Sequence, residues 1–508
     1  MADDDDPPPP SKKLRRKQAK AQWLAARRAA QVASGTHRSS RKRRNQRQSH
    51  VRADVGRWPT VRSRTCSSTT CAHRVAGSAC VVRCIDPYVH RFALFAKGRW
   101  TGHTLRELFA REFPTLSSAY CAQAVHLGLV RVNGSATRLE SVLQSGDFLE
   151  HWKHRHEPDV HCPLTGDPQQ QQQLIDATAL SSTWIHYETS ELLVVNKPSG
   201  LPVHPSGSYY YNSLVHLLQH ERRCEAAAKS SEEAVDRLTL FPVHRLDRLT
   251  SGLLLLAKSA DSARRLTAEL TSCSSVNGSE RRVVQKSYVA RVTGEFPQDE
   301  TASTWAHVDG RRSGLVTIEA VDDGFWRVTA AIGLKSPRQG HVRCVTNAPS
   351  AKSCVTLLRC RGKAENGQSI VECQLVTGRT HQIRVHLQHL GFPIVNDPVY
   401  GPVTTERGRA VADESPAALE VSSVHVEETL SSTGTASPVE DSDREKEERC
   451  LRACDICVGA MQEQSGTTED GDATDGGLWL HSYRYAGRDW SYEVPLPVWA
   501  HVHEAETR

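Results

Sequence analysis

The sequence lacks the features that mark membrane and secreted proteins. No run of 18 consecutive apolar residues occurs anywhere in the 508 residues, which excludes a spanning helix of ordinary length. The opening segment MADDDDPPPP has neither the basic nor the apolar region of a secretory signal peptide. We therefore expect an intracellular protein, in the cytoplasm, nucleus or mitochondrion, with no membrane partner.

Large apolar side chains are also scarce. The chain has nine Phe and two Met, and only 38% of its residues are hydrophobic, as expected where polar segments are joined to folded domains. Its length indicates two or three domains. The 15 cysteines are odd in number and scattered, which is typical of reduced thiols and not of a disulfide scaffold.

Charge is unevenly distributed along the chain. Residues 1–64 hold 18 Lys or Arg against five Asp, whereas residues 402–476 hold six basic and 18 acidic residues. We interpret residues 1–64 as a disordered basic arm, which is either a nuclear address, an RNA-contacting tail or a solubilising segment. Residues 402–476 lack periodicity, and we interpret them as an acidic low-complexity insertion.

The remaining segments are patterned as folded domains. Residues 82–157 predict two helices and a small hairpin, with Thr104 capping the first helix. A linker over 158–182 leads into a mixed domain of helices and strands over 183–401. Residues 477–508 read as two aromatic-rich strands that complete that domain.

Three segments of the mixed domain give clear local predictions. KSYVARVTG alternates like a half-buried strand, with Tyr288, Ala290 and Val292 on one face. SADSARRLTAEL predicts a helix, and TGRTHQIRVHLQHLG predicts a turn into a helix that ends at Gly391. On this pattern Tyr288 is by default a core residue.

The segment with the clearest chemical content is HRLDRLTSG, which precedes a strand of four leucines. Its Asp247 is flanked by Arg245 and Arg248, and neighbouring cations favour the carboxylate form. A carboxylate in such a loop suits a nucleophile. The alternative is an aspartate that caps a turn or bridges Arg245.

This segment resembles the signature loop of the RluA-type pseudouridine synthases. Three further blocks match in order across residues 190–401: VVNKPSGLPVHP, KSYVARVTG and LVTGRTHQIRVHLQHLGFPIVNDPVYG. The segments RCIDPYVHRFALFAKGRWTGHTLRELFAREF, RVNG and HWKHRHEPDV resemble the S4-like RNA-binding module of eukaryotic members. PVHPSGSYYYNSL and LHSYRYAGRDWSYEVPLPVWA resemble the branch that modifies position 32 of tRNA.

The resemblance implies a fold and a reaction. It implies an α+β catalytic domain with a mixed, largely antiparallel sheet and flanking helices, preceded by a small S4-like module. The implied activity is isomerisation of uridine to pseudouridine in RNA, most of all in the tRNA anticodon loop, without a cofactor. Asp247 would be the nucleophile, Arg384 its charge partner and Tyr288 an aromatic that stacks on the base. Arg379 is an alternative partner for Asp247, and Arg384 could instead be a solvated helix residue.

RNA is the implied partner of a chain that we expect to be a monomer. Arg245 would fill the space left by a flipped uridine. The other candidate RNA-binding residues are His244, Lys197, Lys258, Lys286, Arg379 and His381, of which the lysines would contact phosphates or simply be surface residues.

Two functional alternatives stay open. The chain could be an inactive RNA-binding protein that keeps the fold, although the set Asp247, Tyr288 and Arg384 argues against this. It could also be a synthase that acts on rRNA or mRNA.

The spacing of Cys450, Cys454 and Cys457, C-x3-C-x2-C, matches that of iron–sulfur ligands. An acidic insertion that offers only three such ligands argues against a cluster. With His425 and Glu427, the last two cysteines imitate a zinc deaminase, but a low-complexity segment cannot supply the required sheet. We expect no metal in the active site, and a small structural zinc is the alternative left open.

Overall fold

The computed structural model describes residues 58–65, 79–113, 116–164, 180–228, 239–276, 279–298, 305, 314–336, 342–401, 443–457 and 477–501. The chain divides into two compact units, each described here by itself. Within these residues, no helix is both long and apolar enough to cross a membrane.

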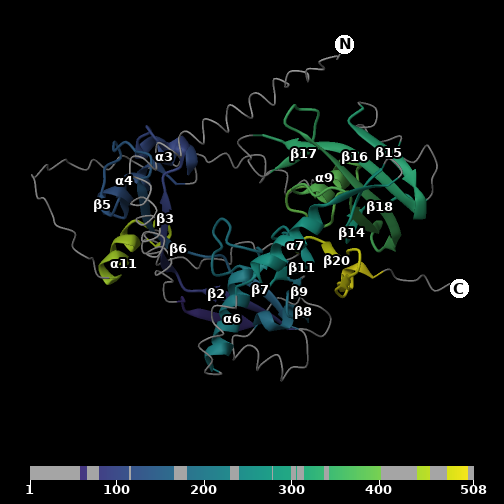
Figure 1. The fold of residues 1–508 in the computed structure, drawn as a ribbon, viewed down its shortest axis with the longest axis horizontal. Coiled ribbons are helices and arrows are strands. Elements are labelled where there is room, and N and C mark those ends of the chain that lie inside the picture. Colours follow the sequence, from purple (N-terminus) through teal and green to yellow (C-terminus); the bar gives the residue numbers. More distant parts are fainter. Residues whose placement is uncertain are drawn as a thin grey trace, which may run out of the picture. The chain divides into compact units, whose positions relative to one another are not determined.

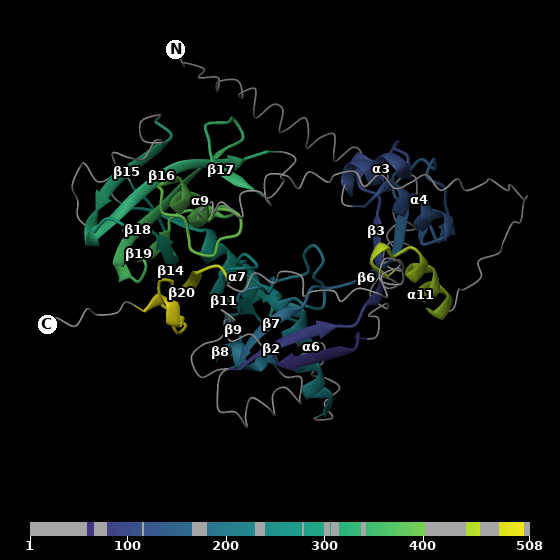
Figure 2. The same ribbon diagram turned by 180° about the vertical axis from the view of Figure 1, so that it is seen from behind.

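The smaller unit contains residues 89–153 and 441–455 (Figure 2). Its sheet has the strand order β3-β6-β4-β5. The predicted helix begins after Thr104, which forms a capping box with Glu107. The elements are β3 (Tyr88–Phe95), η1 (Gly98–Trp100), α3 (Leu105–Glu112), α4 (Ser118–His126), β4 (Val130–Val132), β5 (Ser135–Ala136), β6 (Phe148–Arg155) and α11 (Asp443–Arg452).

Helix α11 departs from the expectation of a featureless acidic insertion. Cys450 and Ala453 are buried in the same core cluster as Trp100 and Leu105 of the smaller unit. The amide of Gln123 donates to the Arg452 carbonyl at 2.9 Å. The sequence DREKEERCLR hides this contact because few apolar residues mark its buried face.

The larger unit is built on a 12-stranded sheet (Figure 1). Its main order is β15-β16-β18-β19-β14-β20-β11-β9-β8, and among the described pairs only β11 and β20 run parallel. The predicted mixed, largely antiparallel sheet is therefore confirmed. The strands are β8 (Ile185–Glu188), β9 (Leu192–Lys197), β10 (Phe241–Pro242), β11 (Ser251–Ala257), β14 (Gln285–Thr293), β15 (Val316–Val321), β16 (Phe325–Leu334), β17 (Arg343–Val345), β18 (Lys352–Ala364), β19 (Gln368–Leu375), β20 (Leu480–Ala486) and β21 (Ser491–Glu493).

Helices and two smaller sheets accompany this sheet. The helices α7 and α9 occur where the sequence predicts them. The remaining elements are β1 (Val61–Thr65), β2 (Ala79–Ile85), β7 (Val160–Leu164), η2 (Leu180–Trp184), α6 (Leu214–Ala228), α7 (Ala260–Thr271), β12 (Cys273–Val276), β13 (Ser279–Arg282), η5 (Asp322–Gly324), α9 (Gln382–His389) and η6 (Val498–Ala500).

Strand β20 lies between β14 and β11 in the middle of the sheet, although it is close to the end of the sequence (Figure 1). Its parallel pairing with β11 brings Gly252 beside Ser482. Gly252 has φ +107°, and a Cβ there would lie 2.1 Å from the Ser482 carbonyl oxygen. Only glycine fits this approach, which fixes the chain at Gly252, the second residue of β11 and five residues after Asp247.

The structure of the larger unit corrects two predictions made from the sequence. The arm predicted over residues 1–64 overlaps β1, which pairs with the buried strand β2. β14 is not half-buried, because Tyr288 and Val289, on opposite faces, are 6% and 0% exposed. Alternation is a poor guide to a central strand that is covered on both sides.

Candidate active site

Asp247 lies in the loop between β10 and β11. The loop turns tightly there, because the Thr250 amide donates to the Asp247 carbonyl at 3.1 Å. The Asp247 side chain keeps 25% of its surface exposed. The carboxylate therefore projects from an ordered turn and remains accessible.

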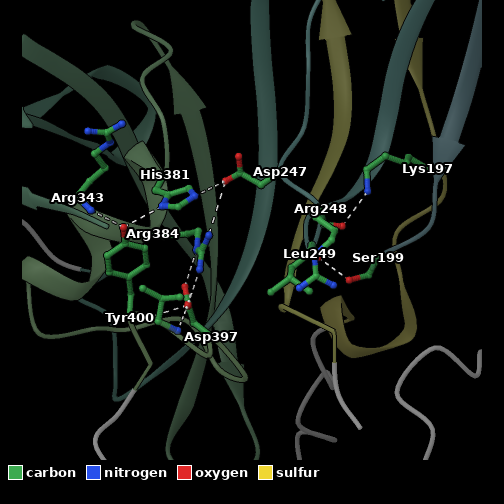
Figure 3. Close-up of polar contacts among 11 residues, drawn as sticks. Lys197, Ser199, Asp247, Arg248, Leu249, Arg343, His381, Arg384, Asp397 and Tyr400 are labelled. Atoms are coloured by element: carbon green, nitrogen blue, oxygen red, sulfur yellow. Dashed lines mark hydrogen bonds and ion pairs between the residues drawn. The ribbon is translucent and has the colours of Figure 1, made fainter. Parts of the chain in front are cut away.

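A second turn, which follows β9, fixes this loop from the other side (Figure 3). The Gly200 amide donates to the Arg248 carbonyl at 2.9 Å. The Ser199 hydroxyl donates to the Leu249 carbonyl at 2.5 Å. The ammonium of Lys197 donates to the same Arg248 carbonyl at 3.1 Å. Every acceptor in this clamp is a backbone carbonyl within two residues of Asp247.

Lys197 is fully buried, which overturns the expectation that it contacts phosphate. Its ammonium also donates to the carbonyls of Pro198 and Leu201, each at 2.8 Å. Burial lowers the pKa of Lys197 to about 7, and the charge of Asp247 opposes that shift. Lys197 is a positioning residue for the loop that carries Asp247.

We expect the Lys197→Met variant to be less stable than wild type. It should also be a slower catalyst, because the loop that carries Asp247 is held less firmly. It leaves three buried carbonyls with one donor fewer each, a cost of about 1–3 kcal/mol for each unsatisfied group. Because the native pKa lies below the unfolded one, the unfolded chain binds more protons between pH 7 and 10.5. The stability of wild type relative to Lys197→Met should therefore rise across this window. Chemical denaturation of both proteins as a function of pH measures the two free energies of unfolding. A difference between them that stays constant with pH would contradict the lowered pKa of Lys197.

The carboxylate of Asp247 faces two nitrogen-bearing side chains (Figure 3). Its Oδ2 lies 3.8 Å from Arg384 Nη1 and 3.7 Å from His381 Nε2. These are the ion pairs of Asp247 within the described residues, so the alternatives Arg245 and Arg379 are not its partners there. The structure thus brings Asp247 and Arg384 together, as the resemblance implies.

Arg384 is oriented by a carboxylate that sequence reasoning missed. Its Nε and Nη2 donate to Asp397, both at 2.7 Å, and the Asp397 side chain is 0% exposed. Burial lowers the pKa of Arg384, but the hydrogen bonds and charge of Asp397, aided by Asp247, raise it overall. This bidentate pair uses one edge of the guanidinium and turns Nη1 toward Asp247.

His381 stands at the start of α9 in a left-handed conformation, with φ +58°. Its Nδ1 lies 2.8 Å from the Tyr400 hydroxyl, which also accepts from the Arg343 amide at 2.8 Å. Because the Tyr400 oxygen already accepts one hydrogen bond, its own proton is best donated to His381 Nδ1. The ring proton of His381 then lies on Nε2, which faces Asp247. His381 is thus a neighbour of the carboxylate, although sequence analysis named it only as an RNA contact.

Tyr288 of β14 is buried beside Tyr485 of β20. Their hydroxyls lie 2.9 Å apart, and burial raises the pKa of Tyr288 well above its usual value, with Tyr485 and Asp247 contributing. The low exposure of Tyr288 means that stacking on a base is not available to most of the ring in this conformation.

The remaining residues predicted to contact RNA fall into two groups, those with partners inside the protein and those that are exposed. Lys258 pairs with Glu188 and donates to a backbone carbonyl, and His244 Nε2 accepts from the Leu255 amide, so both have structural partners. Lys286 lies over the ring of Tyr485 at 5.4 Å. The residues that are exposed are Arg245 and Arg379.

Comparison with known proteins agrees with this fold. The family model for RNA pseudouridylate synthase matches residues 191–389. The chain is 34% identical over 424 residues to RNA pseudouridine synthase 7 of Oryza sativa subsp. japonica, covering 82% of this chain and 90% of that protein. It is 29% identical over 469 residues to the mitochondrial tRNA pseudouridine(32) synthase of Saccharomyces cerevisiae, covering 89% and 86%. It is 32% identical over 329 residues to the tRNA pseudouridine(31) synthase of the same yeast, covering 63% and 72%.

These findings place the chain among the isomerases that act on RNA. It belongs to the RNA pseudouridylate synthase family. The resemblance of residues 190–401 to pseudouridine synthases is confirmed, as are the enzyme class and the RNA substrate.

Proposed function

We propose that the chain converts uridine to pseudouridine in the tRNA anticodon loop, with Asp247 as the nucleophile. The observation that carries this proposal is the accessible carboxylate on a clamped turn, 3.8 Å from Arg384 and 3.7 Å from His381. The carboxylate is the nucleophilic form of an aspartate, and the Arg384 guanidinium faces it. Relatives named for positions 32 and 31 of tRNA support the substrate.

The reaction is an isomerisation, so its atoms balance within one nucleotide. The bond from ribose C1′ to uracil N1 breaks, and a bond from C1′ to C5 forms after the ring turns. The C5 proton is lost and N1 gains one. Asp247 serves either by adding to the ribose or the ring, or by promoting elimination from the sugar. Arg384 and His381 orient the carboxylate in each route.

We propose that the smaller unit is the S4-like module and that it contacts the tRNA together with the basic segment 1–64, most of which lies outside the described residues. Arg245, exposed beside the proposed nucleophile, fills the space left by the flipped uridine. A monomer is sufficient for this arrangement, and a mitochondrial site of action is supported by the name of one relative.

The test uses the purified full-length protein and unmodified tRNA transcripts. Pseudouridine formed at each position is mapped by mass spectrometry of nuclease fragments. We expect conversion at position 32 or 31, and none in matched transcripts with cytidine at both positions. Conversion confined to rRNA or mRNA fragments would overturn the tRNA assignment. Binding of tRNA without conversion of any RNA would favour the inactive RNA-binding protein.

A further inference from the structure

Two histidines and a cysteine from distant parts of the sequence lie side by side. His154 Nδ1 and His156 Nε2 are each 3.3 Å from the sulfur of Cys457. The two imidazole rings are 4.9 Å apart, as expected for side chains two residues apart on an extended segment. Nitrogen and sulfur atoms at this spacing are the ligand types that zinc prefers.

A second cysteine completes the group. Cys454 precedes Cys457 by three residues, which is the C-x2-C spacing of zinc sites. The four potential ligand atoms, one each from His154, His156, Cys454 and Cys457, lie within 4.8 Å of one another. In a tetrahedral site the zinc bond lengths require about 3.6 Å between nitrogen and sulfur. The nitrogen-to-sulfur distances at Cys457, 3.3 Å each, are already near that value.

We propose that these four residues bind a structural zinc ion. Two thiolates and two imidazoles in a tetrahedral arrangement favour zinc over the harder divalent cations. Four protein ligands leave no open position for water or substrate, so the ion would not act in catalysis. The assignment selects Cys454 and Cys457 from the C-x3-C-x2-C pattern and leaves out Cys450, which is buried among apolar side chains.

The zinc would act as a cross-link between remote chain segments. Cys457 is 303 residues from His154 and 301 from His156 along the sequence. Joining such distant segments removes many conformations from the unfolded chain, and zinc that binds only the folded form adds its binding energy to stability. The tie would hold the residues that directly follow α11.

Metal content of the full-length protein tests the proposal. The protein is purified without chelators, and zinc is measured by elemental mass spectrometry. We expect about one zinc ion per chain. After removal of zinc, cobalt added alone should give the visible absorption of a tetrahedral site with thiolate ligands. A wild-type protein that holds no zinc after incubation with zinc salt, or that holds iron instead, would overturn the proposal.

Variants locate the ion. His156→Ala and Cys457→Ser should each lower the zinc content at least about fivefold, whereas Cys450→Ala, a cysteine on the same segment, should keep the wild-type content. Loss of zinc from Cys450→Ala with retention in Cys457→Ser would overturn the ligand set. The cobalt spectrum of wild type decides the matter if a variant fails to fold. Asp247→Asn should keep its zinc, so failure of this proposal is distinct from failure of the catalytic one.

Discussion

The Asp247→Asn variant should lose at least about 1,000-fold in the rate of pseudouridine formation. The amide has the size of the carboxylate but cannot act as the nucleophile. Stability should change little, because the side chain is 25% exposed and its ion-pair distances of 3.7 and 3.8 Å exceed hydrogen-bond length. Single-turnover conversion of tRNA measures the rate, and thermal unfolding measures the stability.

Asp261→Asn is the matched control for this variant. Asp261 is on α7 and its side chain is 84% exposed, so the same chemical change there should leave rate and stability as in wild type. Affinity for tRNA, measured by gel shift, should be close to wild type in both proteins. An Asp247→Asn rate within tenfold of wild type would refute the role of the carboxylate.

The place of the catalytic loop could be predicted from the sequence, because its chemistry and its strand are adjacent along the chain. Asp247 sits between two arginines and just before four leucines that become the buried β11. Helices α3 and α7 were likewise predictable from their caps and periodicity. Such local signals depend on residues within one turn or strand of each other.

The supports of the loop could not be predicted, because they arise from tertiary contacts. Lys197 is the last residue of a buried strand and precedes a turn, where a lysine is ordinarily solvated. Only the fold directs three carbonyls at its ammonium. Asp397 lies 13 residues beyond Arg384, in a loop whose return to α9 has no periodic signature. The one available signal was the presence of Asp397 and Tyr400 in the matched block FPIVNDPVYG.

Breaking the buried pair of Arg384 and Asp397 should be the most destabilising change near the site. Arg384→Met leaves the fully buried Asp397 carboxylate without a cation, and removal of one partner from such a pair costs about 3–5 kcal/mol. Asp397→Leu leaves the guanidinium with Asp247 alone, at 3.8 Å. Both variants should unfold at lower denaturant concentration, and both should lose activity.

The double variant Arg384→Met with Asp397→Leu separates the two roles of Arg384. Removing both charges together ends the penalty of an unpaired buried charge, so part of the lost stability should return. The amides of Val399 and Tyr400, which each donate to Asp397 at 2.9 Å, lose this acceptor, so the recovery should be incomplete. Activity should not return, because Asp247 has lost the cation that orients it. Arg384→Lys should fall between these cases, since an ammonium cannot bind Asp397 in a bidentate manner and face Asp247 at once. Recovery of the rate along with stability in the double variant would show that Arg384 supports only the fold.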